Sequence, residues 1–383
     1  QEFLRYYSGL VQSDENKNVD PYLTAIARLQ MARIETSLGN LEVADRLLHT
    51  LIQDLREGDA ALEKNASLSL SGTHPRSTLL LARAWFSLGI VNQRLKNIDR
   101  AAKDFQKAAK LFNYLLNVVP TLPDVQLLAA DNYVKMGSLA LGQRRWAPSQ
   151  KYFDEAINSY QRLIETPQPI DAAFFGLARC YKYRGDWERL RGNQRGYRQY
   201  LEASYRELEQ IVETPQHTPT LKTIRPLVTT CRDLGNSYAT SKDSKTALLW
   251  YEKAFHSSTL VSSIGDPTGA YDALKADVLV NWATSLTIVG QDKKAMEKCG
   301  NALKIWQVIH EQHPNNRQFA AQRAVAMGQL SRIQIKVGNL DAARNHLMEA
   351  KQVLSKLLRE QPGEAQFSSE LEKILRLLQQ LGN

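Results

Sequence analysis

The sequence is poor in cysteine, and its three cysteines form no recognisable pattern. Cys180, Cys231 and Cys299 are odd in number, and no two have the spacing of a CxxC pair. The spacing therefore supports neither a disulfide framework nor a zinc site. Cys231 and Cys299 fall at repeat positions that elsewhere carry core residues, so we predict that they are small core side chains.

Long apolar runs and catalytic signatures are also missing. No stretch approaches the ~18 uncharged apolar residues that a membrane-spanning helix needs. The phosphate-binding patterns GxxxxGK[ST] and GxGxxG do not occur, and the segment His310–His313 lacks the HExxH spacing of zinc enzymes. We therefore predict that the chain is not an enzyme and that it binds neither a metal nor a cofactor.

Charge of one sign is only mildly in excess. The 383 residues carry a formal net charge of +9, which permits an acidic partner without requiring one. No secretory signal peptide is visible, and the chain begins with Gln1, so we expect it to be a fragment of a longer protein.

What the sequence does contain is a repeat with a period of mostly 48 residues. Small residues recur at one position, and mostly bulky residues recur at a second position, 16 residues later. The small series is Gly89, Gly137, Gly185, Gly235, Ala283 and Ser331, and the second series is Phe105, Phe153, Leu201, Tyr251, Cys299 and Leu347. Self-similarity at a fixed period of this length is typical of solenoid architectures.

Each repeat is predicted to form two helices joined by a short polar turn. Apolar and small residues recur at spacings of three, four and seven, which places them on one face of a helix. A small residue at a helix crossing lets two backbones approach, and a bulky neighbour fills the space. Gly39, Asn97, Gly290 and Gly338 are predicted to end first helices in the left-handed conformation, and Asp20-Pro21 and Asp266-Pro267 are predicted to begin helices.

The domain organisation follows from the period. We predict a partial repeat or helix at residues 1–18, a repeat array at 19–362 and a capping helix at 363–383. The units of the array are predicted at 19–58, 75–120, 123–167, 169–215, 219–263, 267–314 and 315–362. A Ser- and Gly-rich stretch at Asp59–Ser77 breaks the period and is predicted to be a mobile loop.

The pattern resembles the tetratricopeptide repeat (TPR) family over essentially the whole chain. Its signature of aromatic, Leu-Gly, Ala, aromatic and Ala positions is matched in one unit by Trp85, Leu88, Gly89, Ala101, Phe105 and Ala108. The resemblance implies an all-α, right-handed α-solenoid of about seven helix-turn-helix units. The units are longer than the family's usual 34 residues, and helices of roughly 18–22 residues account for the difference.

The family binds partners in a concave groove lined by the first helix of each pair. Aligning the repeats on the small series predicts a groove that carries Lys, Arg, Tyr and Asn side chains, similar to the carboxylate clamp of chaperone-tail-binding members. The predicted partner-binding residues are Arg83, Lys135, Arg179, Lys182, Tyr183, Arg189, Arg232 and Asn236. The resemblance thus implies a scaffold or adaptor that binds a protein or an acidic peptide.

Three alternatives stay open at this stage. Residues 179–200 interleave arginines with aromatics, a composition that could instead bind nucleic acid by stacking bases, although arginines on amphipathic helices also commonly coat the surface without a ligand. The partial repeat at the N-terminus could mediate self-association. The opening segment and the irregular units also resemble the C-terminal regions of large bacterial membrane-anchored Ser/Thr kinases, which would make the chain a regulatory or sensory arm. We expect a cytoplasmic location, or an extracytoplasmic one in the case of such a kinase.

Overall fold

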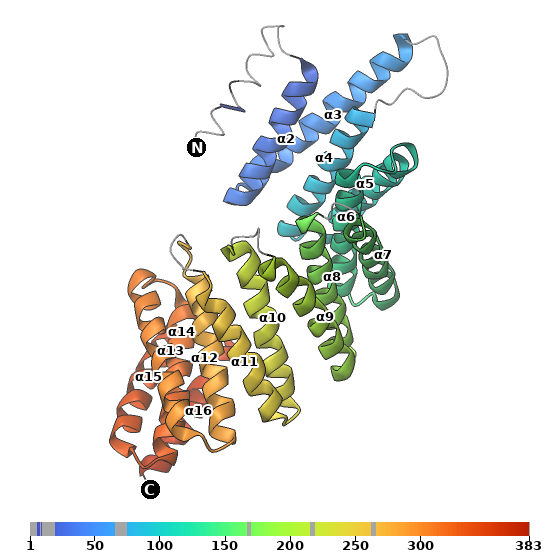
Figure 1. Cartoon of the computed structure of the whole chain (residues 1–383). Helices are drawn as coiled ribbons and strands as arrows, with labels where there is room; N and C mark the ends of the chain where they lie inside the picture. Colours follow the sequence, from blue (N-terminus) through green and yellow to red (C-terminus); the bar gives the residue numbers. More distant parts are fainter. Residues whose placement is uncertain are drawn as a thin grey trace. The chain divides into compact units, whose positions relative to one another are not determined.

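The protein is all-α. The computed structural model describes residues 6–7, 9, 20–65, 75–166, 170–214, 219–261 and 266–382, and these residues form helices and no β-strand (Figure 1). The chain divides into two compact units, residues 1–192 and residues 193–383. The predicted fold class, an all-α helical repeat, is confirmed.

Consecutive helices pack as antiparallel neighbours within each unit. Unit 1 contains α2 (Pro21–Leu38), α3 (Leu41–Asn65), α4 (Pro75–Arg94), α5 (Ile98–Val118), α6 (Pro123–Gly142), α7 (Trp146–Ile164) and α8 (Asp171–Leu190). Unit 2 contains α9 (Gln194–Glu213), α10 (Leu221–Thr240), α11 (Ser244–Thr259), α12 (Ala270–Ile288), α13 (Asp292–Gln312), α14 (Arg317–Lys336), α15 (Leu340–Glu360) and α16 (Ala365–Gly382). Most helices have the expected length, but α3 extends to 25 residues and α11 has only 16.

The two helices of a hairpin meet where the small and bulky series face each other. A Cβ atom added to Gly89 would lie 2.6 Å from the Phe105 ring, and one added to Gly235 would lie 2.5 Å from the Tyr251 ring. Gly137 meets Phe153 in the same way. All three aromatic side chains are buried. The predicted steric role of the small positions is therefore confirmed in both units.

The first helices of the hairpins form a continuous row within each unit. In unit 1, α2 contacts α4, α4 contacts α6, and α6 contacts α8; in unit 2, α10 contacts α12, α12 contacts α14, and α14 contacts α16. We call the surface that these helices present on the side away from their hairpin partners the first-helix face of each unit. Residues at repeat-equivalent positions recur along this face.

The turn between the helices of a hairpin repeats the same backbone conformation. Gly39, Gly290 and Gly338 adopt the predicted left-handed conformation, with φ of 89°, 79° and 84°. Asn97 does not, because its neighbour Lys96 takes the left-handed position instead, with φ of 63°. Arg144 and Lys242 occupy the equivalent position in later repeats, with φ of 56° and 64°.

Two boundary predictions are wrong and one is confirmed. Asp20 caps α2 by accepting a hydrogen bond from the Tyr22 amide, with Pro21 at the first helical position, as predicted. Asp266 instead lies in a turn that precedes α12: its carboxylate accepts from the amides of Thr268 and Tyr271, and the helix begins only at Ala270. The predicted loop at Asp59–Ser77 is helical up to Asn65 and again from Pro75, while residues 66–74 lie outside the described residues.

The last helix covers the end of the apolar core. Phe367 and Ile374 of α16 are buried, and they pack into a cluster with Met327 of α14 and Leu354 of α15. Ile374 also contacts Gly328, where an added Cβ would lie 2.7 Å from its Cδ1 atom. The three cysteines are buried and free. The N-terminal segment for which we expected self-association lies mostly outside the described residues.

Candidate functional site

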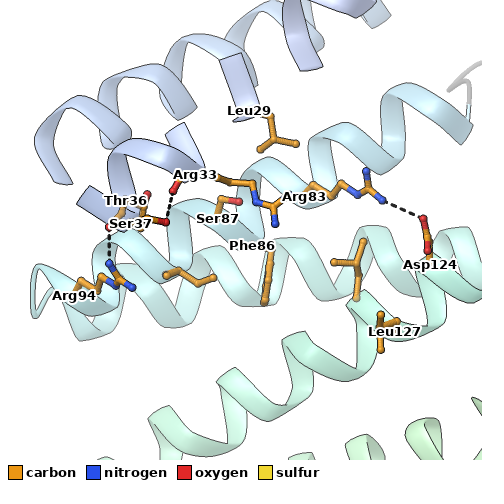
Figure 2. A pocket seen from close by; sticks show the side chains of 12 residues that line it. Leu29, Arg33, Thr36, Ser37, Arg83, Phe86, Ser87, Arg94, Asp124 and Leu127 are labelled. Atoms are coloured by element: carbon orange, nitrogen blue, oxygen red, sulfur yellow. Dashed lines mark hydrogen bonds and ion pairs between the residues drawn. The ribbon is translucent and has the colours of Figure 1, made fainter. Parts of the chain in front are cut away.

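A groove of about 430 Å³ opens on the first-helix face of unit 1, between α2, α4 and α6 (Figure 2). We call it the α2–α4–α6 groove. Its lining combines an apolar floor with several cationic side chains and a single carboxylate. The lining residues are Leu29, Arg33, Thr36, Ser37, Arg83, Phe86, Ser87, Ile90, Arg94, Asp124, Leu127 and Leu128.

The floor of the groove packs against the apolar core of unit 1. Leu29 of α2 is only 2% exposed, and Phe86 of α4 packs against Phe105 with ring centroids 5.9 Å apart. Leu127 and Leu128 of α6 complete the apolar surface. A preformed apolar floor of this kind can receive a side chain of a partner without reorganisation.

Two of the three arginines of the groove are engaged with neighbouring groups. Arg83 Nη2 lies 3.6 Å from Asp124 Oδ2, and the Asp124 side chain is 70% exposed, so this pair is weakly held. Arg94 donates to the carbonyl of Thr36 at the end of α2, at 2.5 Å. Lys336 repeats that contact in unit 2 by donating to the carbonyl of Thr287 at 2.9 Å. A cation at the carbonyl end of a helix is favoured by the helix dipole, which gives Arg94 a structural role.

Arg33 is the cation of the groove whose side chain has no ion pair or hydrogen bond to any residue that the structure describes. It is exposed, and Figure 2 shows it extending from α2 over α4 toward Ser87. Its guanidinium has five donor groups, none of which is bonded to a described residue. The groove thus carries an apolar floor and an uncommitted guanidinium side by side.

A second polar cluster lies farther along the same face, on α6, α7 and α8. Arg179 forms an ion pair with Asp131, and the Tyr160 hydroxyl donates to Asp131 at 2.6 Å. Burial, followed by the positive charge of Arg179, lowers the pKa of Lys135. Two of the predicted residues, Lys135 and Arg179, therefore lie close together, with Arg179 already holding a carboxylate of the chain.

Other predicted residues of unit 1 are built into the helix packing or paired. Tyr183 stacks on Phe153 at 5.9 Å, with the rings 6° from parallel. Arg189 forms an ion pair with Asp186 at 3.2 Å. Both line a cavity of about 570 Å³ at the ends of α6 and α8, together with Trp146. Lys182 lies on α8, partly exposed.

The predicted residues of unit 2 are committed to contacts within the unit. Arg232 donates to Asp233 at 3.0 Å and also lies 3.7 Å from Asp277. The amide oxygen of Asn236 accepts a hydrogen bond from the Tyr251 hydroxyl at 2.7 Å. Both side chains therefore make polar contacts within unit 2.

Two aromatic side chains of the basic and aromatic stretch at residues 179–200 are buried. Trp187 is 3% exposed and Tyr197 is 8% exposed. Arg184 and Arg191 lie over the Trp187 ring, at 4.1 and 4.5 Å from its centroid, and Arg184 also pairs with Glu188 at 2.9 Å. Base stacking needs an accessible ring face, which these two residues do not offer.

The sequence prediction omitted Arg33, although the repeat contains a signal for it. The predicted residue Asn236 aligns with Asp186, Ser138 and Ile90 in earlier repeats. Across the irregular stretch the repeats are 57 residues apart, and this offset aligns Ile90 with Arg33. Carrying the alignment through that insertion would have placed Arg33 on the first-helix face. The prediction also omitted Arg94, which binds the Thr36 carbonyl at the end of α2.

Neither a metal cluster nor a membrane span is found in the part of the chain that the structure covers. No group of three or more His, Cys, Asp or Glu side chains is close enough there to hold a metal ion. Among the helices described above, none combines the length and apolar character needed to cross a bilayer. His313, from the pair noted in the sequence, packs instead against Phe319 with ring centroids 5.8 Å apart.

The sequence and the fold were compared with known proteins. Residues 82–113 match the tetratricopeptide repeat family model, and this segment contains the signature residues from Trp85 to Ala108. The search of curated proteins gave no significant match.

Several solved structures share the fold at low sequence identity. A signal transduction ATPase with numerous domains (STAND protein) with a tetratricopeptide repeat sensor, from Pyrococcus horikoshii, is 13% identical with a TM-score of 0.54. The match covers 99% of this chain but 51% of that protein, so this chain spans about half its length. The nuclear import adaptor Nro1 from S. pombe is 16% identical, with a TM-score of 0.52 over 78% of this chain and 99% of that one.

A third similar structure is BtubC from P. vanneervenii, 13% identical, with a TM-score of 0.52 over 68% of this chain and 92% of that one. These likenesses establish the fold, and the predicted link to Ser/Thr kinases stays a prediction. The chain is a tetratricopeptide-repeat-like helical repeat protein, with a matched tetratricopeptide repeat at residues 82–113.

Proposed function

We propose that this chain is a protein-interaction scaffold that binds an acidic peptide segment of a partner in the α2–α4–α6 groove. The observation that carries the proposal is the position of Arg33, an uncommitted guanidinium beside an apolar floor. An acidic side chain or carboxylate can bind Arg33, while a neighbouring apolar side chain contacts Phe86 and Leu128. Binding, and not catalysis, is the activity that such a surface supports.

The other groove residues define how the peptide would be oriented. The Arg83–Asp124 pair is exposed and long, so a ligand carboxylate can replace Asp124 at Arg83 at little cost. Lys135 and Arg179 would extend the cationic surface along the same face for a longer peptide. Lys182, Tyr183 and Arg189 lie beyond them, and Arg232 and Asn236 belong to unit 2.

Two fold relatives are consistent with a binding role. Nro1 is a nuclear import adaptor, and the STAND protein carries its tetratricopeptide repeats as a sensor. Because identity to both is far below 25%, they support the general class of binding scaffold and leave the ligand to be argued from this chain's own residues.

The test is a comparison of matched double variants in a pull-down from the native extract. Arg33→Gln with Arg83→Gln removes two charges from the groove, and Arg100→Gln with Lys103→Gln removes two from exposed positions of α5. We expect the first variant to lose a partner that the second retains, and we expect that partner to contain an acidic segment that binds as an isolated peptide. Equal retention by both variants would show that the groove is not the binding surface.

A further inference from the structure

A cavity of about 460 Å³ lies in unit 2 at the ends of α13, α14 and α15, and not between its first helices. We call it the α13–α15 pocket. It lies where α13 ends, where α14 begins and where α15 approaches its C-terminus. Its lining residues are His310, Pro314, Asn315, Arg317, Ala320, Arg323, Val353, Lys356, Leu357 and Glu360.

The pocket is strongly cationic. Arg317, Arg323 and Lys356 contribute three positive charges, and Glu360 contributes the single carboxylate of the lining. The lining therefore has two cations in excess. A cavity with such a charge imbalance and low-dielectric walls attracts anions.

The three cations are unequally engaged. Arg317 Nε donates to Glu360 Oε2 at 2.9 Å, and Arg323 pairs through Nη2 with Glu349. Lys356 is exposed and has no ion pair with any residue that the structure describes. A ligand anion can therefore engage Lys356 without breaking an existing contact.

Two nitrogen atoms of the lining residues have no hydrogen-bond partner although they are buried. They are Nε of Arg323 and Nδ1 of His310. An unsatisfied buried polar group costs roughly 1–3 kcal/mol, and more when it is charged. The Nε–H of Arg323 is thus a donor without a partner, on a residue that lines the cavity.

We propose that the α13–α15 pocket binds a phosphate group, with Arg323 and Lys356 as its main ligands and Arg317 at its margin. A phosphate carries a charge close to −2 and three acceptor oxygens. It is therefore attracted by the cationic lining and can accept from donors on α14 and α15 together. A single carboxylate has half that charge and would compete poorly with Glu360 and Glu349, which already hold Arg317 and Arg323. Arginine forks and lysine point charges both suit phosphate.

The first experiment titrates the purified full chain with inorganic phosphate at constant ionic strength, with chloride and acetate as reference anions, by calorimetry and thermal unfolding. We expect saturable phosphate binding and a rise in Tm that chloride does not produce. We expect Lys356→Gln to weaken binding at least about tenfold, the loss of one charge-assisted hydrogen bond. Lys351→Gln makes the same charge change on α15 outside the pocket and should leave binding intact.

A second variant distinguishes a loss of phosphate binding from a loss of structure. Arg323→Lys keeps the charge but removes the fork, and we expect it to weaken phosphate binding while the circular dichroism spectrum stays unchanged. A phosphoserine peptide titrated in parallel separates a phosphorylated partner, which would bind more tightly than inorganic phosphate, from a free phosphate, which would not.

Three results would overturn the proposal. The first is that phosphate raises Tm no more than chloride does. The second is that Lys351→Gln and Lys356→Gln change phosphate binding equally. The third is that acetate produces as large a response as phosphate. The last would show that the pocket recognises a carboxylate.

Discussion

The two units share their helix packing and differ in what surrounds the cationic side chains of their first-helix faces. Gly137 receives the Phe153 ring in unit 1 as Gly235 receives the Tyr251 ring in unit 2. On the first-helix face, Arg33 of unit 1 lines the α2–α4–α6 groove, whereas Arg232 of unit 2 holds Asp233 and lies near Asp277. Arg332 of unit 2, which aligns with Arg33 in the repeat, is also exposed. The recurring residues thus determine the contacts within hairpins, whereas the polar contacts on the first-helix face differ from one unit to the other.

The largest expected effect tests the shared packing. Gly137→Ala and Gly235→Ala should each lower the free energy of unfolding by about 1–3 kcal/mol, because the new Cβ would overlap an aromatic ring in a filled core. Gly142→Ala is the control, since no atom lies within 4 Å of its added Cβ. Urea denaturation followed by circular dichroism gives the three values, and a loss confined to one unit would show that the units do not share this packing.

The next effect tests the difference between the faces. Arg33→Glu should weaken binding of the captured acidic peptide about tenfold or more, the loss of a charge-assisted hydrogen bond. Arg332→Glu reverses the charge at the aligned, exposed position of unit 2 and should leave the affinity nearly unchanged. Fluorescence anisotropy with the labelled peptide measures both. An equal loss in the two variants would mean that long-range charge, and not the groove, determines binding.

A smaller effect is expected at the left-handed residue of the turns between paired helices. Arg144→Gly in unit 1 and Lys242→Gly in unit 2 should each stabilise the protein by about 1 kcal/mol, because an L-residue in the left-handed conformation is strained by that amount. The reverse change, Gly338→Lys, should destabilise it to a similar extent. Chemical denaturation checks all three, and a destabilising effect of the glycines would assign these cations a structural contact.

The smallest effect concerns a buried carboxylate of unit 1 that has no acidic counterpart in unit 2. Burial raises the pKa of Asp104 despite a hydrogen bond from Asn92 at 2.9 Å and the nearby charge of Lys107. A pKa higher in the folded than in the unfolded state means that the folded state binds more protons, so the contribution of Asp104 to stability falls as pH rises through that range. Asp104→Asn should flatten the stability profile from about pH 4 upward, whereas a parallel profile would show that other groups produce the slope.

The sequence predicted the repeat, the hairpins and the close Gly–aromatic contacts because these depend on residues that recur at a fixed period. Its two boundary errors lie where the period fails. Asp266-Pro267 resembles Asp20-Pro21 in sequence, but the Asp266 carboxylate binds the Thr268 and Tyr271 amides and delays the start of α12. For the site, the alignment predicted which residues lie on the first helices, but it could not predict their ion pairs. Asp277, a partner of Arg232 from the next repeat, does not recur at equivalent positions of the other repeats of unit 2.

The most direct test places the same photo-crosslinking amino acid at two equivalent positions, Ser87 in the α2–α4–α6 groove and Asn281 on the first-helix face of unit 2. Each protein is irradiated in the native extract, and the adducts are identified by mass spectrometry. The account predicts an adduct with an acidic segment of a partner at position 87, its loss when Arg33 is also changed to Glu, and little of it at position 281. Equal adducts at both positions, or an adduct at 87 that survives Arg33→Glu, would contradict it.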